Sequence, residues 1–366
     1  FERLGFSGLE VGLLVSAGFA AGILSPLLQV SVIRLFRGPR LPLLMALAGA
    51  ALALGTLPLV TAFLPLLLHF FAFSFFASAI FPLNTACTLD AVRHRGHGAY
   101  FGIRSLGTLG FLAGCAVSVR YTGFSRLPAL YLGFAGAYAL ALAVVAWDYP
   151  GRAAREAAAP RSGAGFARAF ALLREGRTGK LLLVLGLMNF ANGLALCVQG
   201  NYLTHRWAGG QASISQAWVV STACEVPLFL LCAYVLRRYG LRYVLALGLA
   251  GTLVKILGVA AASELWQYFL ALSMHGFFYS GALTGFSVHL DRSFDPADRP
   301  ALQALSVVFF QGIPNALAGL AAGLVWHFSS LRSVYFLAGG VAVLVSLHGF
   351  RLLRHPTAGF RKEAAN

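Results

Sequence analysis

The sequence predicts an all-α polytopic membrane protein with eleven membrane-crossing helices. Three observations predict this class: 58% of the 366 residues are hydrophobic, only 11% are charged, and the apolar residues gather in long continuous runs. A soluble globular domain has a charged fraction of about a quarter, so a soluble enzyme is excluded. Runs without strict alternation favour helices over the strands of a membrane barrel.

Each predicted helix is an apolar run long enough to cross the hydrocarbon core, which takes about 20 residues. The runs cover 9–33, 41–60, 64–90, 99–119, 128–147, 180–203, 214–236, 243–262, 267–290, 301–325 and 333–350. The five cysteines fall inside apolar stretches, with no C-x-x-C pair or histidine cluster beside them. No disulfide framework, metal site or cofactor is therefore predicted.

Basic residues are distributed unequally between the two sets of loops. Of the 28 Lys and Arg, 21 fall in the loops of one side and 5 in those of the other, while Arg104 and Lys255 lie within spans. The 5 are Arg3, Arg120, Arg126, Arg206 and Arg332. By the positive-inside rule the richer side, which includes the C-terminus, is cytoplasmic. The net charge of +16 then indicates loops beside an anionic membrane face rather than a nucleic-acid surface.

One long connection divides the spans into five and six. It is rich in Arg, Ala, Gly and Pro and contains a candidate amphipathic surface helix near 166–173. The predicted organisation is an N-terminal half, a basic cytoplasmic linker, a C-terminal six-helix half and a cytoplasmic tail, at 1–147, 148–179, 180–353 and 354–366.

A partial repeat relates the two halves at an offset of 202 residues. Gly38-Pro39-Arg40 matches Gly240-Leu241-Arg242, and several apolar positions after each also match. Chance similarity in apolar sequence is the alternative explanation. If the repeat is real, the N-terminal half lacks its first helix, so eleven of an expected twelve are present. Two pseudo-symmetric six-helix halves that rock around a central site are a transporter plan.

Three ionisable residues fall near the middle of successive spans. Glu225, Lys255 and His275 lie within roughly 5 Å of one layer, at about 1.5 Å of rise per residue. Such residues are costly in a membrane and mark proton or substrate pathways. Burial favours the neutral carboxyl and a neighbouring cation favours the carboxylate, so this group is a candidate proton-coupling site. The alternative is a structural ion pair between Glu225 and Lys255.

A second candidate group would bind solute. Arg104, Thr108 and Phe111 share one face of the fourth span, a combination that suits a planar or anionic solute. The alternative for Arg104 is snorkelling to the interface. Polar amides in other spans could line a cavity or simply bridge helices; they are Asn189, Asn192, Gln199 and Asn84. Asp90 is a weaker candidate near a helix end, and His69 and His289 are expected to be packing or interface residues.

The fourth span carries a resemblance to a known family. YFGIRSLGTLGF at 100–111 resembles the Y-x-x-I-R-x-x-G-[ST]-x-G-F stretch of major facilitator superfamily symporters, in the branch of nucleoside:proton symporters and phenylpropionate permeases. Supporting matches are FPLN at 81–84, ACEV at 223–226, LSMHG at 272–276 and LQA at 302–304. The first amide is Asn189 rather than the Gln of nucleoside carriers, and Lys255 replaces a frequent Arg. The substrate therefore stays open between a nucleoside and an aromatic carboxylate.

This resemblance implies a twelve-helix major facilitator fold with both termini cytoplasmic. It also implies that the positions of Arg104, Thr108, Phe111, Asn189, Asn192 and Glu225 line a central cavity. We expect a monomeric, multi-pass secondary transporter of the bacterial cytoplasmic (inner) membrane that carries a small molecule together with a proton. The alternatives are a degenerate carrier that acts as a receptor or scaffold, and a membrane-embedded enzyme. No H-E-x-x-H, G-x-S-x-G or P-loop motif supports the enzyme or a nucleotide-driven pump.

Overall fold

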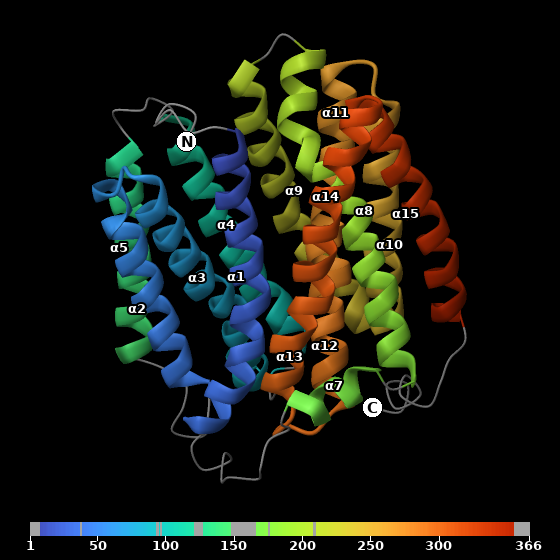
Figure 1. Cartoon of the computed structure of the whole chain (residues 1–366). Helices are drawn as coiled ribbons and strands as arrows, with labels where there is room; N and C mark the ends of the chain where they lie inside the picture. Colours follow the sequence, from blue (N-terminus) through green and yellow to red (C-terminus); the bar gives the residue numbers. More distant parts are fainter. Residues whose placement is uncertain are drawn as a thin grey trace. The chain divides into compact units, whose positions relative to one another are not determined.

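The computed structural model describes residues 8–36, 39–92, 95, 97–120, 127–147, 166–174, 176–207 and 210–354. Nearly all of these residues are helical, and no strand occurs among them (Figure 1). The α-helices are α1 (Gly8–Leu35), α2 (Arg40–Thr56), α3 (Phe63–Ala91), α4 (His97–Arg120), α5 (Leu127–Trp147), α7 (Phe166–Arg174), α8 (Gly176–Arg206), α9 (Gly210–Tyr239), α10 (Leu241–Ala261), α11 (Leu265–Leu272), α12 (Thr284–Ser293), α13 (Arg299–Val307), α14 (Ile313–Phe328) and α15 (Leu331–Arg354).

Nine helical stretches in the described part of the chain are long and apolar enough to cross a membrane. They coincide with nine of the eleven predicted spans, with differences of a few residues at the ends. The two other predicted spans fall on α1, which has 28 residues, and on an interrupted stretch from α11 to α12. The all-α polytopic membrane class is thus confirmed, and the number of eleven crossings is approximate. Helix α7 also forms where a short surface helix is predicted.

The interrupted stretch contains two changes of helical type. A 3₁₀ turn, η5 (Ser273–His275), follows α11, and a π-helical turn, η6 (Phe278–Leu283), precedes α12. Close backbone contacts explain the glycines here: a Cβ on Gly281 would lie 2.6 Å from the Gly248 Cα, and one on Gly276 would lie 2.7 Å from the Glu225 Cα. The missing side chains let this stretch approach α10 and α9 closely. This approach places His275 beside both helices.

The chain packs as two compact units, which are considered one at a time. The first holds α1, α2, α3, α5, α13 and α7 up to Leu173; the second holds α4, α8 to α12, α14 and α15. In the first unit α3 packs along α1 and α2, around an apolar cluster of Leu43, Ala46, Leu47, Ala79 and Leu83.

Helix α4 packs along α9 in the second unit, while α8 lies against α14 and α15, and α10 against α15 (Figure 1). Nine of the ten predicted site residues lie on helices of this unit. The division into two halves at 148–179 remains a prediction.

Candidate solute and coupling site

Lys255 and His275 form a buried polar contact in the second unit. Lys255, on α10, is 1% exposed, and His275, in η5, is 2% exposed. The Lys255 Nζ lies 3.0 Å from the His275 Nδ1 and also donates a hydrogen bond to the Asn192 Oδ1 of α8. With Lys255 as an ammonium group, which can only donate, Nδ1 accepts and the proton of a neutral His275 lies on Nε2. Two of the three predicted coupling residues are thus in direct contact.

Glu225 does not pair with Lys255. It is half-buried on α9, and its Oε2 accepts a hydrogen bond from the Thr108 Oγ1 at 3.4 Å. The ion pairs within 4.0 Å in the described ranges include His97–Asp291 and Arg168–Asp298, and none is found between Glu225 and Lys255. The structural Glu225–Lys255 ion pair is therefore not observed. The carboxylate and the ammonium each have a separate neutral partner, so either can change partner without breaking an ion pair.

The predicted face of α4 meets α9 through two of its three residues. Thr108, 8% exposed, contacts Glu225, and its hydroxyl also lies 3.4 Å from the Arg104 carbonyl oxygen. The Arg104 guanidinium carbon lies 6.0 Å from the centre of the Phe229 ring, within range of a cation–π interaction. Phe111 is 57% exposed. The i, i+4 step of Arg104 and Thr108 brings a cation and a hydroxyl to the same partner helix.

Two amides of α8 connect Lys255 to a backbone carbonyl group of a neighbouring helical stretch. Asn192 Nδ2 donates to the Asn189 Oδ1 at 3.5 Å, and Asn189 Nδ2 donates to the Phe310 carbonyl oxygen at 2.8 Å. Both asparagines are buried, at 1% and 2% exposure. Asn189 Nδ2 also lies 3.2 Å from the Asn315 Oδ1. These bonds bridge helices, which agrees with the structural role that is the alternative to lining a cavity. They also complete the surroundings of Lys255.

The carbonyl that accepts from Asn189 lies in an irregular turn just before Pro314. In an α-helix the carbonyl of residue 310 would bond to the N–H of residue 314, but proline has none. The chain forms a π-helical turn at this point, η7 (Val308–Gly312). The Phe310 carbonyl receives the Asn189 amide instead. A buried carbonyl is thereby satisfied by a side chain that sequence analysis assigns to a solute site.

The two remaining predicted amides are Gln199 and Asn84. Gln199 is buried on α8, at 6% exposure. Asn84 lies on α3 in the first unit, where it is exposed and its Oδ1 accepts a hydrogen bond from Thr88 at 3.4 Å. The Asp90 side chain lies outside the described residues. His289 packs by its ring against Phe286 and bonds to Thr178, in agreement with a packing role.

Three neighbours of the cluster are not among the residues predicted from the sequence. Trp218 and Tyr279 lie edge-on to the His275 ring, with ring centres at 6.5 Å and 5.2 Å. Asn315 is the third. The sequence could have indicated Asn315, because it is an amide within an apolar span and directly follows a proline. The two aromatic residues give no such signal, because aromatic side chains are common in every span.

Comparison with known families decides the classification. Residues 1–337 match the model of the MFS_1 like family. The chain belongs to this family. Family membership agrees with the predicted major facilitator resemblance and with a membrane transporter rather than an enzyme. A search among curated proteins found no match.

Solved structures similar to this MFS_1-like protein are transporters of the major facilitator fold. A mutant of the nucleoside transporter NupG is 17% identical, with a TM-score of 0.67 over 96% of this chain and 92% of that chain. The E. coli fucose:proton symporter FucP is 13% identical, with a TM-score of 0.67 over 96% and 92%. The human organic anion transporter MFSD10 is 18% identical, with a TM-score of 0.69 over 92% and 83%. At these identities the similarity shows the fold.

Proposed function

We propose that this MFS_1-like protein is a proton-coupled secondary transporter of a small organic solute, either a nucleoside or an aromatic carboxylate. The observation that carries the proposal is the separation of charges inside the second unit: Glu225 bonds to Thr108, while Lys255 bonds to Asn192 and His275. Charges at this depth are costly unless they serve a pathway. The proteins of similar fold include a nucleoside transporter and an organic anion transporter.

Glu225 is the proposed proton carrier. As a carboxylate it accepts from Thr108; as a carboxylic acid it donates a proton to a solute or to a neighbouring oxygen. Lys255 and His275 provide the adjustable partner, because a solute acceptor group can replace Asn192 on the ammonium. Arg104, Phe111, Asn189, Gln199 and Asn84 are proposed to contact solute with Thr108 and Asn192.

The proposed cycle is alternating access, with proton and solute entering from outside and leaving to the cytoplasm. Linkage requires that each ligand tighten the binding of the other if both favour the same occluded state. The proposed setting is a monomer in the lipid bilayer of a bacterial inner membrane. In this proposal the C-terminus is cytoplasmic, and two halves on either side of residues 148–179 rock against each other.

Uptake by proteoliposomes under an imposed pH gradient tests the proposal. A panel of uridine, adenosine and 3-phenylpropionate identifies the solute class, and an uncoupler must collapse any accumulation. Glu225→Gln should abolish gradient-driven uptake while solute exchange at equal pH continues. Glu264→Gln is the matched control, since Glu264 caps α11 away from the cluster and a glutamine retains the acceptor oxygen. Gradient-driven accumulation by Glu225→Gln at the wild-type rate would refute the coupling role.

A non-transporting receptor built on the same fold is the second candidate function. It predicts solute binding without accumulation in any gradient. Binding to the detergent-solubilised protein, measured beside uptake on the same preparation, distinguishes the two functions.

A further inference from the structure

Three polar side chains meet in the second unit, where α4 begins and α12 ends. The His97 Nε2 lies 2.8 Å from the Asp291 Oδ2, and the Arg292 Nε lies 3.4 Å from the His97 Nδ1. Asp291 is 4% exposed, whereas His97 is partly exposed and Arg292 is exposed. None of the three belongs to the solute and coupling site. The histidine therefore connects a buried carboxylate on one helix with the start of another.

The protonation state of His97 decides how strongly the two helices are held together. An arginine N–H can only donate, so beside Arg292 the Nδ1 of a neutral His97 accepts and its Nε2 donates to Asp291. A second proton, on Nδ1, keeps the bond to Asp291 and adds the attraction of opposite charges. It also ends the contact with Arg292, which costs little because the arginine is exposed to water. Protonation of His97 therefore strengthens the contact with Asp291.

The cations around His97 do not reverse this effect. Arg237 of α9 packs against the start of α4, since a Cβ on Gly98 would lie 3.3 Å from the Arg237 Cδ. Arg237 is exposed, and so is Arg95, two residues before His97. These cations and Arg292 disfavour a charged ring, but water and salt screen exposed charges strongly. The buried Asp291 carboxylate is at hydrogen-bond distance and therefore decides the sign: lower pH favours the contact.

The contact joins the two halves that the proposed transport cycle moves apart. His97 precedes the linker at 148–179, and Asp291 follows it. The loops next to both residues are on the side that the positive-inside rule predicts to be cytoplasmic. In an alternating-access cycle the halves separate at this end when the site opens to the cytoplasm. The contact between His97 and Asp291 then has to break before solute is released.

We propose that His97 and Asp291 form a proton-operated latch that holds the cytoplasmic end of the carrier closed when the cytoplasm is acidic. This inference rests on the proposed function, because alternating access supplies the opening that the latch opposes. Histidine ordinarily changes charge between about pH 5 and 8, a range that includes physiological pH. A carrier that brings protons into the cell would thereby slow its own uptake as the cytoplasm acidifies.

A double-mutant cycle of thermal unfolding tests the latch without transport. His97→Gln keeps a donor for Asp291 but cannot take up a second proton, and Asp291→Asn removes the carboxylate. The coupling is the non-additive part of the change in melting temperature in detergent. It should be at least about twice as large at pH 6 as at pH 8, because the charged ring bonds the carboxylate more strongly. Equal coupling at both pH values would overturn the latch.

Solute exchange tests what the latch does. Exchange of uridine and of 3-phenylpropionate is measured in proteoliposomes with the same pH on both sides, about 6 or about 8, within the range in which histidine titrates. The Glu225→Gln protein is the parent, so that the proposed coupling carboxylate does not titrate. Its exchange should be about threefold to tenfold slower at the lower pH, a factor that corresponds to about 0.7–1.4 kcal/mol.

Two substitutions of His97 fix the latch in opposite states. His97→Gln should remove the slowing at low pH, because glutamine stays neutral. His97→Arg should exchange slowly at both pH values, because its charge is permanent. The same slowing in His97→Gln as in the parent, or equal exchange by the parent at both pH values, would overturn the proposal.

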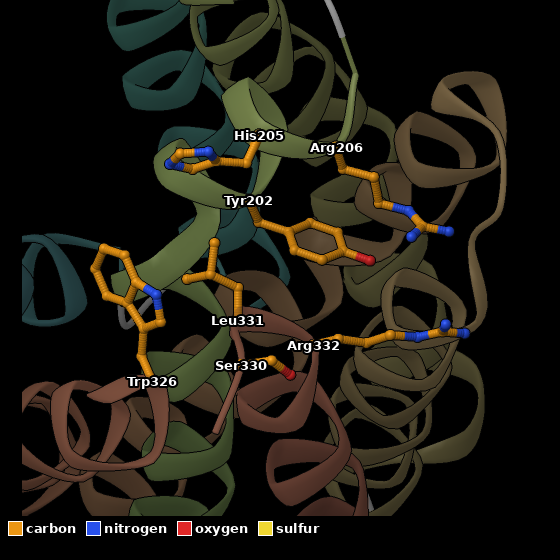
Figure 2. Close-up of a pocket in the computed structure, with 7 residues that line it drawn as sticks. All are labelled: Tyr202, His205, Arg206, Trp326, Ser330, Leu331 and Arg332. Carbon is orange, nitrogen blue, oxygen red and sulfur yellow. The ribbon is translucent and has the colours of Figure 1, made fainter. Parts of the chain in front are cut away.

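His205→Gln is the matched control. His205 is an exposed histidine in the last turn of α8, where it lines a pocket with Tyr202 and Arg206 (Figure 2). The loop charges predict that this end of the helix faces outside, so the variant should keep the slowing of the parent. If the wild-type protein exchanges no solute of the panel, the proposed function fails, and the unfolding cycle still decides whether the latch exists.

Discussion

Asn189→Ala should destabilise the protein chiefly by leaving the Phe310 carbonyl without its side-chain donor. The Asn189 amide is 2.8 Å from that oxygen and 3.2 Å from the Asn315 Oδ1, and it is 2% exposed. An unsatisfied buried acceptor costs about 1–3 kcal/mol, and a further lost hydrogen bond about 0.5–1.5 kcal/mol. We therefore expect a loss of about 2–4 kcal/mol in the free energy of unfolding. Asn84→Ala, at an exposed asparagine, is the matched control and should cost about 0.5 kcal/mol or less.

A double-mutant cycle with Pro314→Ala tests the reason for this loss. The substitution supplies the backbone N–H that an α-helix would offer to the Phe310 carbonyl. The cost of Asn189→Ala should then fall by about 1–2 kcal/mol, within the range of coupling energies for residues that share a partner. Reversible unfolding in mixed micelles measures all four proteins. Equal costs of Asn189→Ala in both backgrounds would refute the reasoning, because the proline would then have no part in creating the acceptor.

Three other substitutions test the packing and the site. Gly281→Ala places a Cβ 2.6 Å from the backbone of α10 and should lower the free energy of unfolding by about 3 kcal/mol or more. Gly340→Ala, with open space around it, should be neutral or stabilising. Thermal unfolding compares the two variants. Arg168→Gln removes a 3.1 Å ion pair with Asp298. The free energy of unfolding should fall by less than about 1 kcal/mol, because the arginine side chain is 62% exposed and water screens its charge. A larger loss in the same assay would contradict this screening. Thr108→Val should lower proton-driven uptake at least tenfold, because it removes the hydroxyl that contacts the α9 carboxylate. The free energy of unfolding should fall by about 0.5–1.5 kcal/mol, the net contribution of one hydrogen bond. Wild-type uptake would exclude that contact from coupling.

Hydropathy predicted most of the fold because every backbone polar group in lipid must be satisfied within its own helix. Long apolar runs such as Leu331–Arg354 therefore have one structural solution, and their positions agree with the spans found. The interrupted stretch from α11 to α12 shows the limit. Its composition reads as one continuous span, but the 3₁₀ and π-helical turns depend on where Gly276 and Gly281 meet neighbouring backbones. These contacts are made with other helices, so the sequence of the stretch alone does not predict them.

The depth of a residue could be predicted from the sequence, but the direction of its side chain could not. Counting at about 1.5 Å per residue placed Glu225, Lys255 and His275 in one layer, and Lys255 does contact His275. Direction changes by roughly 100° per residue, because an α-helix has about 3.6 residues per turn. An error of one residue in the relative rotation of α9 and α10 therefore decides whether Lys255 faces a carboxylate or an amide. The structure selects the amide of Asn192. For the proposed coupling role this difference matters, because an ion pair with Lys255 would have to be broken before Glu225 could exchange a proton, whereas the partner that the structure gives Glu225 is the uncharged Thr108 hydroxyl.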